Sequence, residues 1–199
     1  MLDKHYLYTP GPTPVPPEAQ AAMGRPMMAH RGEAFAQLHG EIVEKAKAIF
    51  QTTEDLFVLT SSGTGGLETA IANTVSPKDK VLALVTGNFG QRFRKIAEIY
   101  GADVTEITVA SGDTFTMEQV KEVWEQKGPF KLVLATHNET ATGVTNDIGA
   151  LGEFVAKTKA LLLVDAISSM GAMDIPTDKW RVDIMVTGSQ KDFMLPPGL

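Results

Sequence analysis

Lys191 directly follows an apolar, β-branched stretch that ends in turn-forming residues. Residues 182–186 have the composition of a buried strand, and the sequence Thr187-Gly188-Ser189 breaks it. A lysine just after a core strand lies where the fold exposes side chains to a cleft. When it is partly desolvated, such a lysine loses its proton near neutral pH and attacks a carbonyl group. Taken alone, a residue of this kind is more often a solvated loop lysine.

A second candidate, Asp165, ends the apolar run of residues 161–164. This run also predicts a buried strand, and in open α/β sheets ligands bind outside the carboxyl ends of the strands. A buried carboxylate must find a cationic partner or take up a proton. We therefore interpret Asp165 as a carboxylate that faces a protonated ring nitrogen. Capping of the following turn is the alternative.

The third candidate is the small-residue segment SSGTGG at residues 61–66. A loop of this kind before a helix offers free backbone N–H groups, hydroxyl donors and a favourable helix dipole to an anion. It lacks the Lys-Ser/Thr ending of a P-loop and the glycine spacing of a dinucleotide fingerprint. A plain helix cap is the alternative.

Predicted strands and helices alternate along the chain and position these features. Apolar runs predict strands at residues 56–60, 80–86, 103–109, 131–136, 161–165 and 182–186. Periodic apolar spacing predicts helices at residues 17–23, 33–50, 67–75, 91–100, 116–125 and 147–157. This alternation is typical of an α/β fold with a mostly parallel sheet. We expect an N-terminal arm at residues 1–20 that contributes to the substrate site, and one larger domain at residues 21–199.

The composition narrows the function classes. With 199 residues, of which 43% are hydrophobic and 21% charged, the chain can bury one sizeable core. The net charge is −6 without a basic stripe, so we expect neither nucleic acid nor a membrane surface as a partner. The chain has no cysteine, which suits a cytoplasmic protein. His30 and His39 lack ligand partners at metal-binding spacing, so we expect no metal site.

Together, a reactive lysine, a carboxylate for a ring nitrogen and an anion cradle are what a protein supplies to pyridoxal phosphate. In this combination the sequence resembles the class V aminotransferases of fold type I, most closely the alanine–glyoxylate, serine–glyoxylate and serine–pyruvate branch. The similarity covers essentially the whole chain. It is carried by the motifs TPGPT (9–13), SGTG (62–65), GNFG (87–90), HNETATG (137–143), VD (164–165) and GSQK (188–191). It implies a three-layer α/β sandwich and a chain that continues into a small C-terminal domain.

The resemblance also implies roles for the residues around the cofactor ring. Lys191 would form a Schiff base with the cofactor and then act as general base and acid. Asp165 would keep the ring nitrogen protonated. Phe89 would stack on the ring, and Thr140 would hydrogen-bond the phenolic oxygen.

The remaining implied roles concern the two ends of the site. The cofactor phosphate would be bound by four residues: Ser62, Gly63, Thr64 and Gln190. Gly11 would lie near the carboxylate of the substrate. His137 and Glu139 would brace the loop that carries Thr140.

The activity implied is transfer of an amino group from alanine or serine to glyoxylate or pyruvate by a homodimer. Two alternatives remain open. Other class V enzymes catalyse different reactions with the same set of active-site groups, although a cysteine desulfurase needs a cysteine that this chain lacks. The sequence also resembles the small subunits associated with soluble hydrogenases, which would make the protein a non-catalytic accessory subunit of a larger complex.

Overall fold

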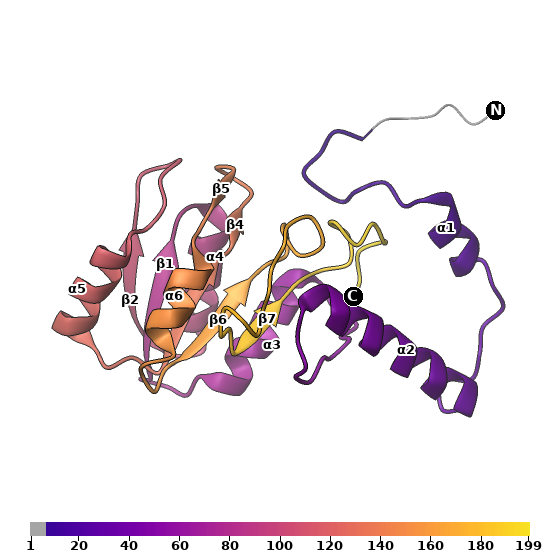
Figure 1. Cartoon of the computed structure of the whole chain (residues 1–199), viewed down its shortest axis with the longest axis horizontal. Helices are drawn as coiled ribbons and strands as arrows, with labels where there is room; N and C mark the ends of the chain where they lie inside the picture. Colours follow the sequence, from indigo (N-terminus) through magenta and orange to yellow (C-terminus); the bar gives the residue numbers. More distant parts are fainter. Residues whose placement is uncertain (1–6) are drawn as a thin grey trace.

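The computed structural model describes residues 7–199 as a parallel sheet with helices on both faces, preceded by a helical arm (Figure 1). Residues 1–6 of the expected arm lie outside the described residues. The strand order is β2-β1-β3-β6-β7, and every neighbouring pair is parallel. The strands are β1 (Lys80–Val85), β2 (Asp103–Thr108), β3 (Leu132–Thr136), β6 (Leu161–Asp165) and β7 (Ile184–Val186). A short antiparallel pair, β4 (Asn138–Glu139) and β5 (Val144–Thr145), follows β3.

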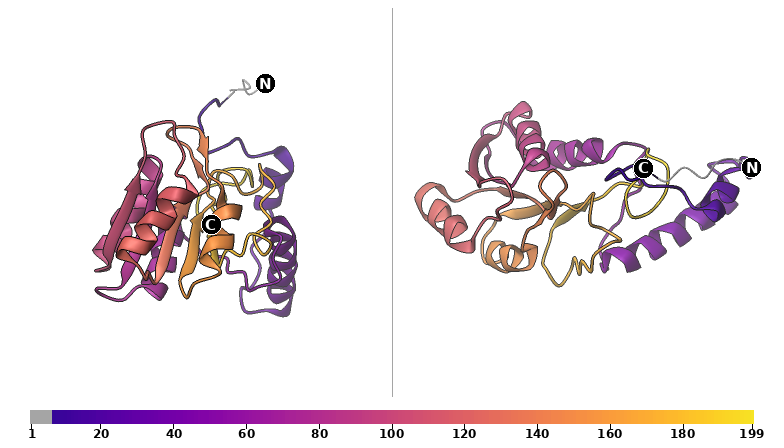
Figure 2. Two further views of the ribbon diagram at one scale, coloured as in Figure 1. Left: turned by 60° about the vertical axis from the view of Figure 1, so that its left-hand side comes forward. Right: turned by 90° about the horizontal axis from the view of Figure 1, so that it is seen from above.

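Helices cover the sheet from both sides, so the expected three-layer α/β architecture is confirmed (Figure 2). The helices are α1 (Pro17–Met23), α2 (Glu33–Phe50), α3 (Gly63–Thr74), α4 (Asn88–Ile99), α5 (Met117–Lys127) and α6 (Ile148–Val155). Leu163 of β6 packs toward α3 and α4, whereas Leu162 and Val164 pack toward α5 and α6. Because the central strands are buried on both faces, they are apolar at nearly every position.

One predicted strand and several predicted boundaries are wrong. Residues 56–60 are not a strand, and Phe57 is 78% exposed. A strand needs a neighbour for its backbone N–H and C=O groups, and no strand among residues 7–199 pairs with this segment. Helices α3 and α4 begin at Gly63 and Asn88, several residues before their predicted starts. The predicted buried strand at 182–186 is the half-buried edge strand β7.

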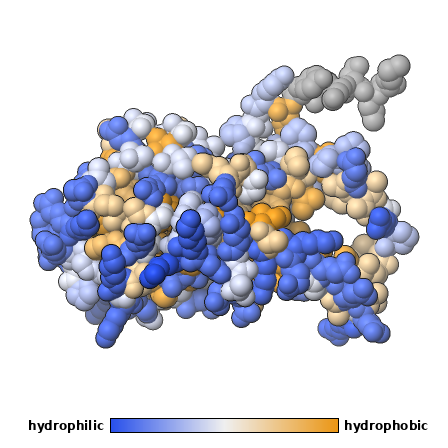
Figure 3. Space-filling view, in the orientation of Figure 1, coloured by the Kyte–Doolittle hydropathy of each residue, from blue (hydrophilic) through white to orange (hydrophobic). Residues whose placement is uncertain are grey.

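Helix α2 has the predicted bounds, but its apolar stripe is not covered by the described part of the chain. None of its residues is buried, and Leu38, Ile42 and Ile49 are exposed. Its C-terminal end is attached to the rest of the chain, since the ring of Phe50 lies 6.5 Å from the ring of Phe193. Figure 3 shows apolar patches among hydrophilic atoms in the part of the molecule that contains α1 and α2. None of the described helices combines the length and the apolar character needed to cross a membrane.

The contact between α6 and residue 180 gives a test of the packing. A Cβ atom at Gly152 would overlap the backbone carbonyl oxygen of Trp180. We expect Gly152→Ala to lower the free energy of unfolding by ~1–3 kcal/mol, because the helix must shift to make room. Gly40 of α2 has open space around its Cα. As the matched control, Gly40→Ala should raise stability by ~0.5–1 kcal/mol. Urea unfolding of the whole protein measures both, and equal stability of Gly152→Ala and wild type would contradict the close approach.

Candidate active site

The parallel register brings the predicted site residues to one edge of the sheet. Asp165 lies opposite Thr136 of β3 and opposite Val186 of β7, so the segments that follow all three strands emerge together. A cavity of ≈ 320 Å³ opens there, within the roughly 300–1,000 Å³ typical of small-molecule sites. Every predicted cofactor or substrate residue except Thr140 lines it. Thr140 lines a smaller adjoining cavity together with Asp165 and Lys191.

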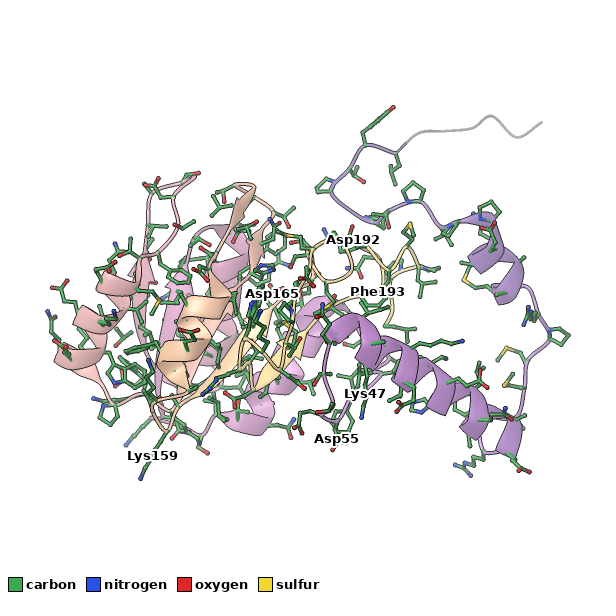
Figure 4. The ribbon with its side chains drawn as sticks, viewed as in Figure 1. Lys47, Asp55, Lys159, Asp165, Asp192 and Phe193 are labelled. Carbon is green, nitrogen blue, oxygen red and sulfur yellow. The ribbon has the colours of Figure 1, made fainter. Side chains whose placement is uncertain are left out.

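Asp165 is a buried carboxylate that faces both cavities. It is 3% exposed, and its Oδ1 accepts a hydrogen bond from the backbone N–H of Ile167 at 2.9 Å. Burial raises the pKa of Asp165 to about 6, against the lowering effect of that hydrogen bond and of the charges of Lys191 and Arg92. No cation among residues 7–199 lies within ion-pair distance of it. The position therefore suits a cationic atom of a ligand. Figure 4 labels Asp165 in the interior of the molecule.

The side chain of Lys191 is held against the N-terminal arm. Its Nζ donates a hydrogen bond to the carbonyl oxygen of Pro10 at 2.7 Å. A Cβ atom at Gly11 would lie 2.7 Å from Lys191 Cδ and 2.9 Å from its Nζ. Thr13 ties the arm to the lysine loop, since its hydroxyl donates to the carbonyl oxygen of Lys191 at 2.6 Å. Gly11 also has a φ of +144°, which favours glycine, so both space and backbone geometry call for glycine here.

The segment predicted as an anion cradle is the first turn of α3. Ser62 caps the helix, and its Oγ accepts a hydrogen bond from the backbone N–H of Gly65 at 3.1 Å. A Cβ atom at Gly63 would lie 2.6 Å from Cδ1 of Ile167, so the glycine allows the helix to approach the loop after Asp165. The helix N-terminus therefore points its free N–H groups and the Thr64 side chain into the cavity. The cap, one of the two alternatives from the sequence, is therefore observed, and anion binding by the same turn stays a prediction.

A single buried carboxylate, that of Glu139, fixes two parts of the site. Its Oε2 accepts hydrogen bonds from the backbone N–H groups of Phe89 and Gly90, each at 3.0 Å. Its Oε1 accepts from the backbone N–H of Ala141 at 3.1 Å. A negative charge is favourable at this place because it lies at the N-terminus of α4. Glu139 thus holds both the aromatic residue Phe89 and the loop that carries Thr140.

His137 and its neighbours link the loops that follow β3 and β6. Its Nδ1 lies 2.8 Å from Oγ of Ser169, and burial lowers its pKa. Ser168 Oγ donates to the carbonyl oxygen of Asn138 at 2.8 Å. These bonds fix the loops on either side of Asp165 relative to each other.

The donor set fits a phosphorylated aromatic ring. A helix N-terminus, an aromatic side chain, a lysine and a buried carboxylate line one cavity. Gln190 also lines the cavity, whereas its Oε1 atom is buried without a hydrogen-bond partner among the described residues. Among residues 7–199, no three histidine, aspartate or glutamate side chains form a group that could hold a metal ion.

Comparison with known proteins places the chain in a family. The family model described as "Aminotransferase class-V" matches residues 5–199. The chain belongs to the class V aminotransferases. Members of this family use pyridoxal phosphate. The resemblance predicted from the motifs is therefore confirmed.

Relatives of this class V chain carry several different names. It is 45% identical to an L-aspartate–glyoxylate aminotransferase of Paracoccus denitrificans, over 100% of this chain and 52% of that protein. It is 38% identical to a soluble hydrogenase small subunit of a Synechococcus species, over 100% of this chain and 53% of that protein. The crystal structure of an alanine–glyoxylate aminotransferase from a Nostoc species superposes with a TM-score of 0.91 at 34% identity, covering 99% of this chain and 54% of that one. The chain thus spans about half the length of these relatives.

Sequence reasoning missed one charged residue of the site, Arg92. It lines the cavity from the second turn of α4, in the stretch that was predicted only as a helix. Its position three residues after Phe89 was the available signal, because residues three apart share one face of a helix.

The raised pKa of Asp165 predicts how stability depends on pH. Without cofactor, the folded protein keeps a proton on this carboxyl up to a pKa of about 6, whereas an unfolded chain releases it near 3.8. Stability should therefore fall as the pH rises from about 4 to about 7, by ~3 kcal/mol. We expect this fall to be absent in Asp165→Asn and retained in Asp113→Asn, an exposed control. Urea unfolding of the cofactor-free whole protein across this range measures it, and parallel pH curves for wild type and Asp165→Asn would refute the assignment.

Proposed function

We propose that the whole protein is a pyridoxal-phosphate-dependent aminotransferase that moves an amino group from alanine or serine to glyoxylate or pyruvate. The observation that carries the proposal is a buried carboxylate, Asp165, which lacks an ion-pair partner among residues 7–199 and opens onto the same cavity as Lys191. The names of the relatives support glyoxylate as the amino acceptor, since both aminotransferases described above carry it in their names.

The roles of the reacting groups follow from their chemistry. Bound pyridoxal phosphate supplies an electron sink for the α-carbon of the amino acid. Lys191 would hold the cofactor through its aldehyde carbon, with loss of water. When freed by the substrate amine, its side chain would move a proton between the α-carbon of the amino acid and that cofactor carbon. Asp165 holds a proton on the ring nitrogen, because a cation next to its carboxylate favours the charged forms of both. The hydrogen bond to Pro10 and the absence of a side chain at Gly11 allow Lys191 to lie against the N-terminal arm beside the cavity.

The other residues bind and orient the ring. Phe89 stacks on its face, and Thr140 hydrogen-bonds its phenolic oxygen. The phosphate is held by the first turn of α3 through Ser62, Gly63 and Thr64, with Gln190 as a further polar contact. The backbone at Gly11 meets the carboxylate of the substrate. The homodimer, the cytoplasmic location and the division into an arm (1–20) and a large domain (21–199) belong to the same proposal.

The hydrogenase-named relative supports a second candidate function, that of an accessory subunit in a larger complex. The two candidates differ in what they demand of the cavity. An accessory subunit does not need its lysine, its carboxylate and its anion cradle to act on one ligand. All three groups are present in this chain and open onto one cavity, which favours the enzyme.

Covalent attachment of the cofactor at Lys191 is the first test. After incubation of the whole protein with pyridoxal phosphate and reduction with borohydride, peptide mass mapping should place the pyridoxyl group on Lys191. The Lys191→Ala variant should carry no label, and Lys95→Ala, a change at an exposed lysine of α4, should be labelled like the wild type. A label on another lysine, or none despite saturating cofactor, would refute the role of Lys191.

Amino transfer itself separates the two candidate functions. The whole protein should transfer amino groups from alanine or serine to glyoxylate or pyruvate, and aspartate should be included as a donor. We expect Asp165→Asn to bind the cofactor more weakly and to lose turnover by about two to three orders of magnitude, because it no longer stabilises charge on the ring. Product formation followed by chromatography measures both. Labelled Lys191 without transfer for any donor and acceptor would favour the accessory subunit, and near-normal turnover of Asp165→Asn would contradict its role.

A further inference from the structure

Arg92 occupies a position from which it can reach an anion in the cradle. It is the fifth residue of α4, on the same face as Phe89, and its guanidinium carbon is 5.3 Å from the centroid of the Phe89 ring. Its Nη1 donates a hydrogen bond to Oγ1 of Thr64 at 3.4 Å. This bond connects the start of α4 to the first turn of α3 across the cavity that both residues line.

The charge of Arg92 is not neutralised within the described part of the chain. Arg94, two residues further along α4, forms ion pairs with Glu98 at 2.7 Å and Glu106 at 3.2 Å. Arg92 has no carboxylate within 4 Å among residues 7–199. An arginine that lines a cavity without an acidic partner, beside a helix N-terminus, makes that end of the cavity positive.

The cavity is therefore lined by groups of opposite charge. One is the buried carboxylate of Asp165, and the other is Arg92, which is hydrogen-bonded to Thr64 in the first turn of α3. A ligand with a cationic ring nitrogen and a phosphate matches this pair of charges. The contact with the Phe89 face restricts the guanidinium, so less side-chain freedom is lost when it binds an anion.

We propose that Arg92 is a specificity-determining residue that binds the phosphate group, so that the site selects pyridoxal phosphate over unphosphorylated pyridoxal. The proposal rests on the proposed function, since it takes the ring ligand as given. The hydrogen bond to Thr64 directs the guanidinium toward the cradle. The guanidinium can then add a charge-assisted hydrogen bond to the neutral donors of the α3 N-terminus.

The test compares the dissociation constants of two ligands. Each ligand attaches to Lys191 in the same way in wild type and variant, so the attachment cancels when the change in each constant on substitution is compared. Equilibrium dialysis of the whole protein with each ligand, for wild type and Arg92→Gln, yields both constants and their ratio. We expect Arg92→Gln to weaken pyridoxal phosphate binding by about 10- to 100-fold and to change pyridoxal binding by no more than about twofold.

Two further variants and a salt series sharpen the measurement. Arg92→Lys should recover part of the preference, because a lysine keeps the charge without the planar fork. Lys95→Gln removes a charge from the same helix away from the cavity and should leave both constants unchanged. The effect of Arg92→Gln should shrink at high salt, since Arg92 is exposed and its charge is screened.

Other outcomes overturn the proposal in distinguishable ways. If both ligands weaken equally, Arg92 acts through the ring of Phe89 and not on the phosphate. If the ratio stays constant while the KM of the amino acid rises, Arg92 binds the substrate carboxylate instead. If wild-type protein binds neither ligand, the proposed function itself fails and the role of Arg92 fails with it. Unchanged pyridoxal binding by Arg92→Gln also shows that the variant is folded.

Discussion

The parallel pairing of β3, β6 and β7 is the constraint on which the site depends. It sets Thr136, Asp165 and Val186 side by side, and each begins the loop that supplies site residues. A shift of one residue in the pairing of β6 would turn Asp165 to the opposite face of the sheet, because side chains alternate along a strand. The apolar residues before Asp165 prevent this shift, since they alternate between two cores, one under α3 and α4 and the other under α5 and α6. The geometry of the site is therefore fixed by core packing.

Charge balance is the second constraint, because two carboxylates are buried close to the same edge. Glu139 is solvated by backbone N–H groups from the start of α4 and from its own loop, so its charge needs no cationic side chain. Asp165 has one backbone hydrogen bond, and the charge of Glu139 further raises its pKa. The two acids therefore differ in how their charge is stabilised. The carboxylate of Glu139 has hydrogen-bond partners within the protein, whereas that of Asp165 favours a positively charged group of a ligand in the cavity.

Much of this arrangement could be predicted from the sequence, because its signals are local. The apolar run before Asp165 and the turn before Lys191 mark the ends of two strands from local sequence alone. In the structure, β6 ends at Asp165 and β7 ends at Val186. The failure at residues 56–60 has the opposite origin. An apolar run records the tendency to form a strand, but a strand requires a partner, and pairing is a long-range property. The early starts of α3 and α4 were missed because their glycine-rich first turns resemble loops, while Ser62 and Glu139 stabilise them as helix.

The role of Arg92 could not be inferred from the sequence, because it depends on the absence of a carboxylate partner, and the sequence alone does not reveal ion pairs. In a helical stretch, Arg92 and Arg94 look alike, and only the structure shows that one is neutralised and the other is not. The same distinction bears on the substrate. Among residues 7–199, the cations that line the cavity are Lys191 and Arg92. If Lys191 reacts with the carbonyl carbon and Arg92 binds the phosphate, neither cation is available to the carboxylate of the substrate. Among the described residues, that carboxylate would then be bound by neutral donors near Gly11. The cavity in this part of the chain therefore specifies the cofactor more strongly than the amino acid.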